Sequence, residues 1–313
     1  MVSRYVDGKS SDLLVPAPAD DAAVWRGDRF VVATVDTMVE GVDFRVDWPG
    51  FSFRTLGRRL MSINLSDLAA MGAEPRHALV SLCLRREMLA ADVDRLYQGL
   101  AEQARRFQCS IAGGDLSATE GPLTATATLI GRVASGRRLL KRSGAKAGWQ
   151  IAVTGTLGGA SAGLRLLESR RPPRTRAERQ WVKAQLDPEP RIEAGRALVR
   201  TGVTVAGDIS DGLSREVEKL TGPHGLGARL DVDRLPLAVG LRPDQWALAL
   251  EDSEDFELVC AAPPAPMQAA TAALGRIGTA LTVVGVIEAE PGVRLRDGGR
   301  PVRSAKVGYA HFR

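Results

Sequence analysis

Strand-like and helix-like segments alternate along this chain, and this alternation limits the possible folds more than any other feature. Apolar residues at helical spacing predict helices at residues 53–71, 91–107, 161–168, 192–201, 213–220, 243–250 and 265–274. Runs rich in β-branched and small apolar residues predict strands at 30–35, 77–84, 109–112, 123–133, 150–154, 203–206, 228–232 and 281–286, with another entered from 254–260. Such an order predicts layered α/β structure rather than an all-β fold or a helix bundle.

The length of 313 residues is sufficient for two domains with separate cores. Residues 1–136 predict a first domain with a β-β-α-β-α-β-β-like order that ends near Gly136. Residues 137–313 open with a basic stretch and predict a second α/β domain. The 44% of hydrophobic and 25% of charged residues are ordinary for a globular protein, so composition does not contradict this division.

The charge of the chain is compatible with an anionic ligand, but it does not indicate nucleic acid. A net charge of +5 and a pI near 9.4 reflect an arginine-rich composition. Aromatic residues are sparse and no recognisable nucleic-acid-binding module is present. The densest basic run, at residues 170–176, is interrupted by prolines and predicts a solvated loop. We therefore expect no nucleic-acid partner.

Cysteine usage and hydropathy predict a cytoplasmic protein. The three cysteines, at positions 83, 109 and 260, are scattered and form no CxxC pair, which argues against disulfides or a zinc site. The polar N-terminal residues include no apolar stretch typical of a signal peptide. No run approaches 18 apolar residues, so we expect no membrane span.

Aspartates recur where the sequence predicts that a strand ends or a helix begins, beside Gly, Ser or Thr. The strand at 30–35 is expected to end at Asp36, and that at 109–112 at Gly113, Gly114 and Asp115. The full set is Asp21, Asp36, Asp67, Asp115, Asp208 and Asp211. At such turns Ser and Asp side chains can cap a helix, or the carboxylates can bind a hard cation such as Mg²⁺. The residues alone leave both explanations open for Asp208, Ser210 and Asp211.

Two further segments allow two interpretations each. Asn64, Ser66 and Asp67 interrupt the helix at 53–71, either as a polar helix face or as a carboxylate presented to a ligand. The glycine-rich turn at 155–160 either binds phosphate on its N–H groups or allows a helix to pack closely on the sheet, and we favour packing.

The acidic set suits metal-dependent handling of nucleotide phosphates. Carboxylates about 4 Å apart repel each other by roughly 1–4 kcal/mol unless a cation lies between them or their pKa values rise. Mg²⁺ prefers carboxylate ligands that it shares with substrate phosphates. The three histidines form no arrangement with Ser or Cys that would indicate a covalent nucleophile.

The chain resembles the thiamine-monophosphate kinase family of the aminoimidazole-ribonucleotide-synthase-like superfamily of ATP-dependent enzymes. The motifs carrying the resemblance occur in order at residues 20–24 (DDAAV), 35–42 (VDTMVEGV), 64–73 (NLSDLAAMGA), 113–115 (GGD), 142–145 (RSGA), 153–158 (VTGTLG), 208–213 (DISDGL), 254–258 (EDFEL) and 308–312 (GYAHF). It implies that family's two-domain fold and direct transfer of the γ-phosphate of ATP to thiamine monophosphate. It also implies a homodimer joined through the strands of the N-terminal domain, and ATP and Mg²⁺ binding in residues 1–136, with residues 137–313 completing the site.

The resemblance also implies roles for individual residues. Several Mg²⁺ ions would be bound by Asp21, Thr34, Asp36, Asp67, Asp115, Asp208 and Asp211. ATP would contact Gly114, Asp115, Arg142 and Ser210, and the catalytic set would be Asp36, Asp115, Asp211 and Arg142. Asp43, Glu254 and Tyr309 match positions that line the thiamine-phosphate site.

This sequence departs from the family pattern at three places. Asp43 stands where the family usually has a histidine, Asp252 and Ser253 replace a pair of glycines, and Val35 replaces a common threonine. An anion beside a phosphate substrate would weaken its binding, unless Asp43 turns away or binds a metal. Two alternatives therefore stay open: a related ATP-dependent enzyme with another acceptor, and a nucleotide-binding protein without catalysis.

Overall fold

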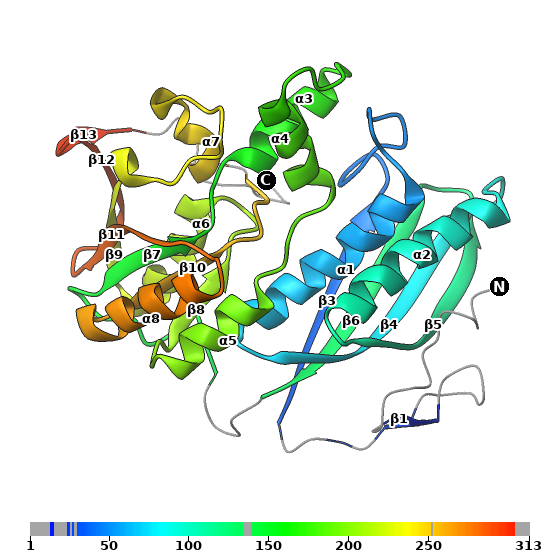
Figure 1. The fold of residues 1–313 in the computed structure, drawn as a ribbon, viewed down its shortest axis with the longest axis horizontal. Coiled ribbons are helices and arrows are strands. Elements are labelled where there is room, and N and C mark those ends of the chain that lie inside the picture. The colour runs from blue at the N-terminus through cyan, green and yellow to red at the C-terminus, as the bar shows by residue number, and fades with distance from the viewer. Residues whose placement is uncertain are drawn as a thin grey trace. The chain divides into compact units, whose positions relative to one another are not determined.

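The computed structural model describes residues 13–15, 24–25, 27, 30–133, 139–251 and 253–303. The chain divides into two compact units (Figure 1). The first consists of Met1–Leu68 with Ala73–Gly136, and the second of Ala69–Gly72 with Arg137–Arg313. Both units combine helices with a β-sheet, so the predicted α/β class is confirmed.

A four-stranded sheet forms the first unit, in the order β3-β6-β4-β5. Its strands are β3 (Val31–Val39), β4 (Glu74–Arg85), β5 (Ser110–Thr119) and β6 (Thr124–Arg132), and only the β4–β5 pair is parallel. The helices α1 (Phe53–Ala70) and α2 (Ala90–Arg106) lie side by side on one face of this sheet (Figure 1). Two short strands, β1 (Leu13–Val15) and β2 (Val24–Trp25), form a separate antiparallel pair.

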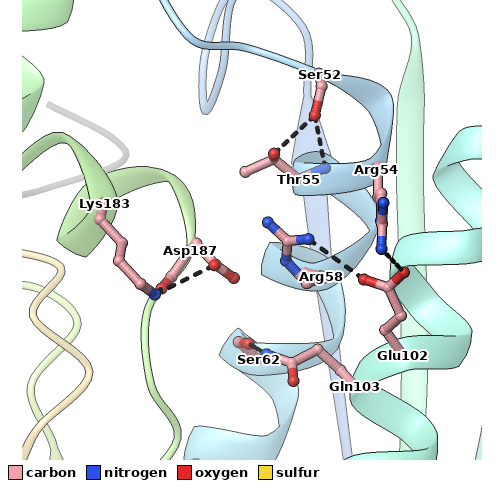
Figure 2. A network of polar contacts seen from close by, with 9 residues as sticks. All are labelled: Ser52, Arg54, Thr55, Arg58, Ser62, Glu102, Gln103, Lys183 and Asp187. Atoms are coloured by element: carbon pink, nitrogen blue, oxygen red, sulfur yellow. Dashed lines mark hydrogen bonds and ion pairs between the residues drawn. The ribbon is translucent and has the colours of Figure 1, made fainter. Parts of the chain in front are cut away.

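Small residues set how closely α1 and α2 approach each other. A Cβ atom at Gly57 would lie 2.0 Å from the carbonyl oxygen of Leu96, and one at Gly99 would lie 1.9 Å from that of Arg54. Polar contacts connect the same helices: Glu102 binds Arg54 and Arg58, and Gln103 Nε2 donates to Ser62 Oγ at 2.8 Å (Figure 2). The two glycines therefore make this helix pairing possible, and the polar contacts fix its register.

A seven-stranded sheet forms the second unit, in the order β13-β12-β9-β11-β7-β10-β8, and only β12 and β9 are parallel neighbours. The strands are β7 (Gln150–Thr154), β8 (Val205–Asp208), β9 (Gly227–Asp231), β10 (Leu258–Ala262), β11 (Leu281–Glu288), β12 (Gly292–Asp297) and β13 (Arg300–Val302). The helices are α3 (Gly159–Glu168), α4 (Arg176–Leu186), α5 (Ile192–Arg200), α6 (Leu213–Thr221), α7 (Ala247–Leu250) and α8 (Pro264–Arg276). Short 3₁₀ turns lie at Gly222–His224, Val232–Arg234 and Pro243–Gln245.

The core of the second unit forms where α6 packs on the sheet. Leu213, Val217 and Leu220 of α6 are buried against strand residues such as Val153 and Val259. The helix α8 contacts β10 and β11 and lies beside α5 (Figure 1). The helix α6 follows β8 after a short turn, and the acidic motif at residues 208–213 spans this turn. The packing of α6 on the sheet therefore fixes one end of the motif.

The structure corrects several predicted elements. The strand predicted at 30–35 extends to Val39, so Asp36 lies within β3 rather than at its end. The strand at 109–112 likewise continues to Thr119, which places Asp115 in the middle of β5. The helix α4 and the strands β12 and β13 were not predicted, and the segment 243–250 is a 3₁₀ turn followed by the single-turn helix α7.

Candidate functional site

Two of the predicted metal ligands in the first unit are in direct contact. The hydroxyl of Thr34 on β3 donates a hydrogen bond to the carboxylate of Asp67 on α1. The amide of Asp36 donates to Asn64 Oδ1 at 3.1 Å, and Asn64 Nδ2 donates to the Leu60 carbonyl at 2.9 Å. The polar residues of α1 therefore bind β3, so that Thr34, Asp36 and Asp67 gather where the helix meets the strand.

Burial argues against one of the two interpretations of the interrupted helix. Asn64 and Ser66 are fully buried, while Asp67 is only partly buried. A solvated polar face of α1 is therefore the wrong explanation for Asn64 and Ser66. Asn64 is a poor helix former, but its side chain accepts a hydrogen bond from the backbone of β3.

Gly114 and Asp115 lie on β5, the edge strand of the four-stranded sheet. A Cβ atom at Gly114 would lie 1.8 Å from the carbonyl oxygen of Val80, so only glycine fits beside β4. The Asp115 carboxylate is exposed and accepts a hydrogen bond from Ser117 Oγ at 3.0 Å. Burial raises the pKa of Tyr97 to about 12, and the negative charge of Asp115 adds to this effect.

Asp43 binds the backbone of its own turn. Its Oδ2 accepts a hydrogen bond from the Val39 amide at 2.7 Å, while the Asp43 amide donates to the Val39 carbonyl at 2.9 Å. The anion that replaces the family's histidine thus closes the turn after β3. This geometry fits a carboxylate that turns away from a phosphate substrate.

Arg142 lies beside two buried carboxylates in the second unit. Its Nη2 is 3.7 Å from Asp208 Oδ1 and 3.6 Å from Glu216 Oε2. The Arg142 side chain is 49% exposed, whereas Asp208 and Glu216 are almost fully buried. The guanidinium therefore neutralises buried anions on one side and remains open to an anionic ligand on the other.

Lys219 connects Asp211 with Glu216. Its Nζ lies 2.7 Å from Asp211 Oδ2 and 2.6 Å from Glu216 Oε1, and Ser210 Oγ is 3.5 Å from the same Glu216 oxygen. Burial raises the pKa of Glu216, with Lys219 and Arg142 opposing that shift and Asp211 adding to it. Burial lowers the pKa of Lys219, but its two carboxylate partners outweigh this effect and leave the pKa raised.

Helix capping does not explain the acidic motif at residues 208–213. The N-cap of α6 is Gly212, and no side chain makes a capping hydrogen bond there. Ser210 and Asp211 instead bind Glu216 and Lys219, so the capping hypothesis for them is wrong. Glu216 and Lys219 were not among the predicted site residues, although their spacing of three residues on a helix would bring them together.

The glycine-rich turn before α3 is occupied by a carboxylate from a distant part of the chain. Asp255 accepts hydrogen bonds from the amides of Gly158 at 2.7 Å and Ala160 at 3.0 Å. Burial raises the pKa of Asp255 to about 6 against the opposing effect of its hydrogen bonds with Ser253, Gly158 and Ala160. This arrangement favours the packing interpretation, since a protein side chain already fills the place of a phosphate.

A cavity of about 330 Å³ lies in the second unit, and Trp181, Arg191, Asp255 and Glu257 are among its lining residues. Arg191 binds Glu257 through Nε at 2.7 Å and Nη2 at 2.5 Å. None of the predicted site residues that the structure describes lines this cavity. Near it in sequence, Glu254 Oε2 accepts a hydrogen bond from Gln185 Nε2 at 2.9 Å.

Two of the predicted site residues, Asp21 of the metal set and Tyr309 of the acceptor site, lie outside the described residues. Within the described parts of the chain, no three His, Cys, Asp or Glu side chains form a group that could hold a metal ion. The donors present are carboxylate and hydroxyl oxygens, the type that Mg²⁺ prefers, so the chemistry of the set fits this ion. None of the helices in the described residues has the length and hydropathy of a membrane span.

Comparison with known proteins identifies the class. The N-terminal domain of AIR synthase related proteins matches residues 19–133, and the C-terminal domain of these proteins matches residues 146–298. A thiamine-monophosphate kinase of Salmonella typhimurium is 35% identical over 323 residues, covering 100% of this chain and 97% of its own. One of Rhodopirellula baltica is 35% identical over 281 residues, covering 83% of this chain and 80% of its own.

Solved structures agree with the sequence matches. The crystal structure of thiamine-monophosphate kinase from Stenotrophomonas maltophilia K279a has a TM-score of 0.82 and 29% identity, covering 94% of this chain and 93% of its own. The structure of AaThiL complexed with AMPPCP and TMP has a TM-score of 0.76 and 27% identity, covering 90% of this chain and 87% of its own. The chain belongs to the AIR synthase related family, among its thiamine-monophosphate kinases, which confirms the resemblance seen in the sequence.

Proposed function

We propose that this protein transfers the γ-phosphate of ATP to thiamine monophosphate, forming thiamine diphosphate and ADP. The observation that carries the proposal is the 35% identity to a thiamine-monophosphate kinase over the whole length of this chain. The similarity to AaThiL complexed with AMPPCP and TMP supports the same pair of substrates. A related enzyme with another acceptor remains the second candidate, because Asp43 replaces a histidine and binds its own turn.

We infer that Mg²⁺ serves this reaction and is held by Asp21, Thr34, Asp36, Asp67, Asp115, Asp208 and Asp211. When bound, the ion offsets the charge that develops as two phosphates approach each other. Residues 1–136 would bind ATP and Mg²⁺, and residues 137–313 would complete the site. The contacts of Thr34 with Asp67 and of Lys219 with Asp211 support these assignments, since they keep the carboxylates in fixed positions before any ligand arrives.

Several residues of the chain would act on the nucleotide and the acceptor directly. The half-exposed Arg142 would bind a phosphate of ATP, and Gly114, Asp115 and Ser210 would contact the nucleotide. Asp36, Asp115 and Asp211 would complete the catalytic set with Arg142. Glu254 and Tyr309 would line the acceptor site, whereas Asp43 would act through the turn after β3. No protein nucleophile is required, because phosphoryl transfer depends on positioning and charge neutralisation.

We also propose that the protein is a cytoplasmic homodimer joined through its four-stranded sheet. Val31 and Val35 of β3 are exposed although they are β-branched and apolar. They alternate with Thr34 and Asp36, and so lie on the face of β3 opposite to these residues. A second copy of the chain could cover this apolar surface. The free cysteines in the described residues are compatible with a reducing compartment.

The test is an assay of purified protein with Mg-ATP and thiamine monophosphate. We expect formation of thiamine diphosphate that stops when EDTA removes the metal, and no product with unphosphorylated thiamine as acceptor. Absence of thiamine diphosphate with turnover of ATP on another phosphorylated acceptor would favour the related enzyme. Binding of AMPPCP without any turnover would instead indicate a nucleotide-binding protein without catalysis.

A further inference from the structure

Two segments of the second unit, residues 208–212 and residues 253–257, are joined by backbone hydrogen bonds. The first segment begins at the last residue of β8 and carries Asp208, Ser210 and Asp211. The Ile209 amide donates to the Glu257 carbonyl at 2.8 Å, and the Phe256 amide donates to the Ile209 carbonyl at 2.9 Å. The Gly212 amide donates to the Ser253 carbonyl at 3.1 Å. These bonds continue the β8–β10 pairing beyond the ends of the two strands. The conformation of residues 208–212 therefore depends on that of residues 253–257.

The backbone conformations of residues 208–212 and 253–257 are tightly constrained. Gly212 has φ +87, and a Cβ atom there would lie 2.5 Å from the Glu251 carbonyl oxygen. Phe256 adopts the left-handed region with φ +50 while its side chain is buried in the core. Such a conformation persists only when surrounding contacts hold it. A shift of residues 253–257 would therefore move residues 208–212 with it.

Asp255 is the side chain that anchors residues 253–257 to the rest of the unit. Its Oδ2 accepts hydrogen bonds from the Gly158 amide at 2.7 Å and the Ser253 hydroxyl at 2.5 Å, and its Oδ1 accepts one from the Ala160 amide at 3.0 Å. The N-cap of α3 is Gly158, which has no side chain of its own for this purpose. Asp255 thus caps a helix that lies almost one hundred residues earlier in the chain, and ties the loop to it.

Ser253 contributes a hydrogen bond that glycine could not make. Ser253 is fully buried, and its hydroxyl donates to the Asp255 carboxylate. The hydroxyl therefore adds a bond to the anchor.

We propose that Asp255, supported by the hydroxyl of Ser253, is a positioning residue that fixes the loop at residues 208–212 for binding of Mg-ATP. The inference rests on the proposed function for the role of that loop. Asp255 acts through the backbone bonds of residues 253–257. Its loss loosens the loop as well as the start of α3.

The experiment compares Asp255→Asn and Ser253→Ala with Thr175→Ala in the full-length protein. Thr175 caps α4 by a similar side-chain bond to the backbone, and it lies outside the two segments, so Thr175→Ala controls for the loss of a helix cap. Ser253→Ala removes one bond and leaves the carboxylate, which gives a mild variant if Asp255→Asn folds poorly. Amide hydrogen exchange of the segment 208–213 is measured without ligand, followed by AMPPCP affinity with Mg²⁺ and by kcat and KM.

We expect exchange at residues 208–213 to become about tenfold faster in Asp255→Asn and less so in Ser253→Ala, since opening of the loop becomes easier. The KM for Mg-ATP and the Kd for Mg-AMPPCP rise by about tenfold in Asp255→Asn, and kcat falls by up to about 100-fold because the loop is misplaced. Thr175→Ala lowers the melting temperature without any of these changes.

Unchanged exchange at residues 208–213 in Asp255→Asn, together with unchanged Mg-AMPPCP affinity, would reduce Asp255 to a helix cap and overturn the proposal. If the proposed function is wrong, the measurements give a different pattern. Wild-type protein would then form no thiamine diphosphate, while the exchange and AMPPCP measurements would still decide whether Asp255 positions the loop.

Discussion

At the scale of single residues, the structure excludes helix capping as the role of Asp211. Its carboxylate binds Lys219 rather than the start of α6, so its presence is not explained by helix capping. We predict that Asp211→Asn abolishes Mg-dependent turnover, with a loss of about 100-fold or more, because metal-assisted charge stabilisation supplies several kcal/mol. The fold should remain intact, since Lys219 retains Glu216 as a partner. Steady-state kinetics at several Mg²⁺ concentrations checks this outcome.

Asp244→Asn is the matched control for this substitution. Asp244 is also an aspartate of the second unit in contact with a cation, but it lies in the 3₁₀ turn Pro243–Gln245, where both it and its partner Arg242 are exposed. Its removal should leave turnover unchanged. Near-normal activity of Asp211→Asn, equal to that of the control, would show that Asp211 has only a structural role.

Glu178 provides a prediction about pH at the start of α4. Hydrogen bonds from Arg171 and from the amides of Arg174 and Thr175 lower the pKa of Glu178 to about 2. Because the folded pKa lies below the unfolded value, this carboxylate stabilises the fold above about pH 4.5, and the contribution is lost as the pH falls toward 2. Urea unfolding should therefore show wild type more stable than Glu178→Gln at pH 6, with the difference smaller at pH 3.5. A difference independent of pH would contradict this account.

At the scale of elements, the pairing of α1 with α2 depends on two glycines. We predict that Gly57→Ala lowers the free energy of unfolding by about 3 kcal/mol, because the added methyl group would overlap the Leu96 carbonyl and force the helices apart. Gly275→Ala in α8 is the control: nothing lies within 4 Å of its Cβ position, so it should stabilise the protein by about 0.5–1 kcal/mol. Denaturant unfolding of both variants measures the contrast, and equal effects would refute it.

The elements that the sequence predicted well are those with strong apolar periodicity, such as α1, α2 and β6. The helix α4 was missed because the basic and proline-containing segment before it indicated a loop, although Thr175 and Glu178 form a capping box at its start. The strand β12 is short and mostly exposed, and β13 has only three residues, one of them a proline, so both give a weak strand signal. Strand ends at Asp36 and Asp115 were placed too early, because acids and glycines normally indicate turns.

For the whole molecule, the sequence predicted a set of candidate residues for the chemistry but not the contacts that hold these residues. Aspartates at similar local positions were recognisable as a set, since their residue type and neighbours can be read directly. The bond between Lys219 and Asp211 and the anchor at Asp255 depend on contacts formed only after folding, and Asp255 joins segments almost one hundred residues apart. Local patterns do not show such contacts, and for this reason the supporting residues were missed, while the metal-binding role of the aspartates stays a prediction.

The proposed dimer is a property of the whole molecule that one surface substitution can test. Val31 is 53% exposed on β3, so Val31→Lys would place a charge in the apolar surface that a second copy is proposed to cover. We expect light scattering with size-exclusion chromatography to show a dimer for wild type and a monomer or a weakened dimer for Val31→Lys. Ile277→Lys, which follows α8 in the second unit and also replaces an exposed apolar residue, should remain dimeric. A wild-type monomer at micromolar concentration, or a Val31→Lys variant as dimeric as the control, would exclude this face of the sheet as the interface.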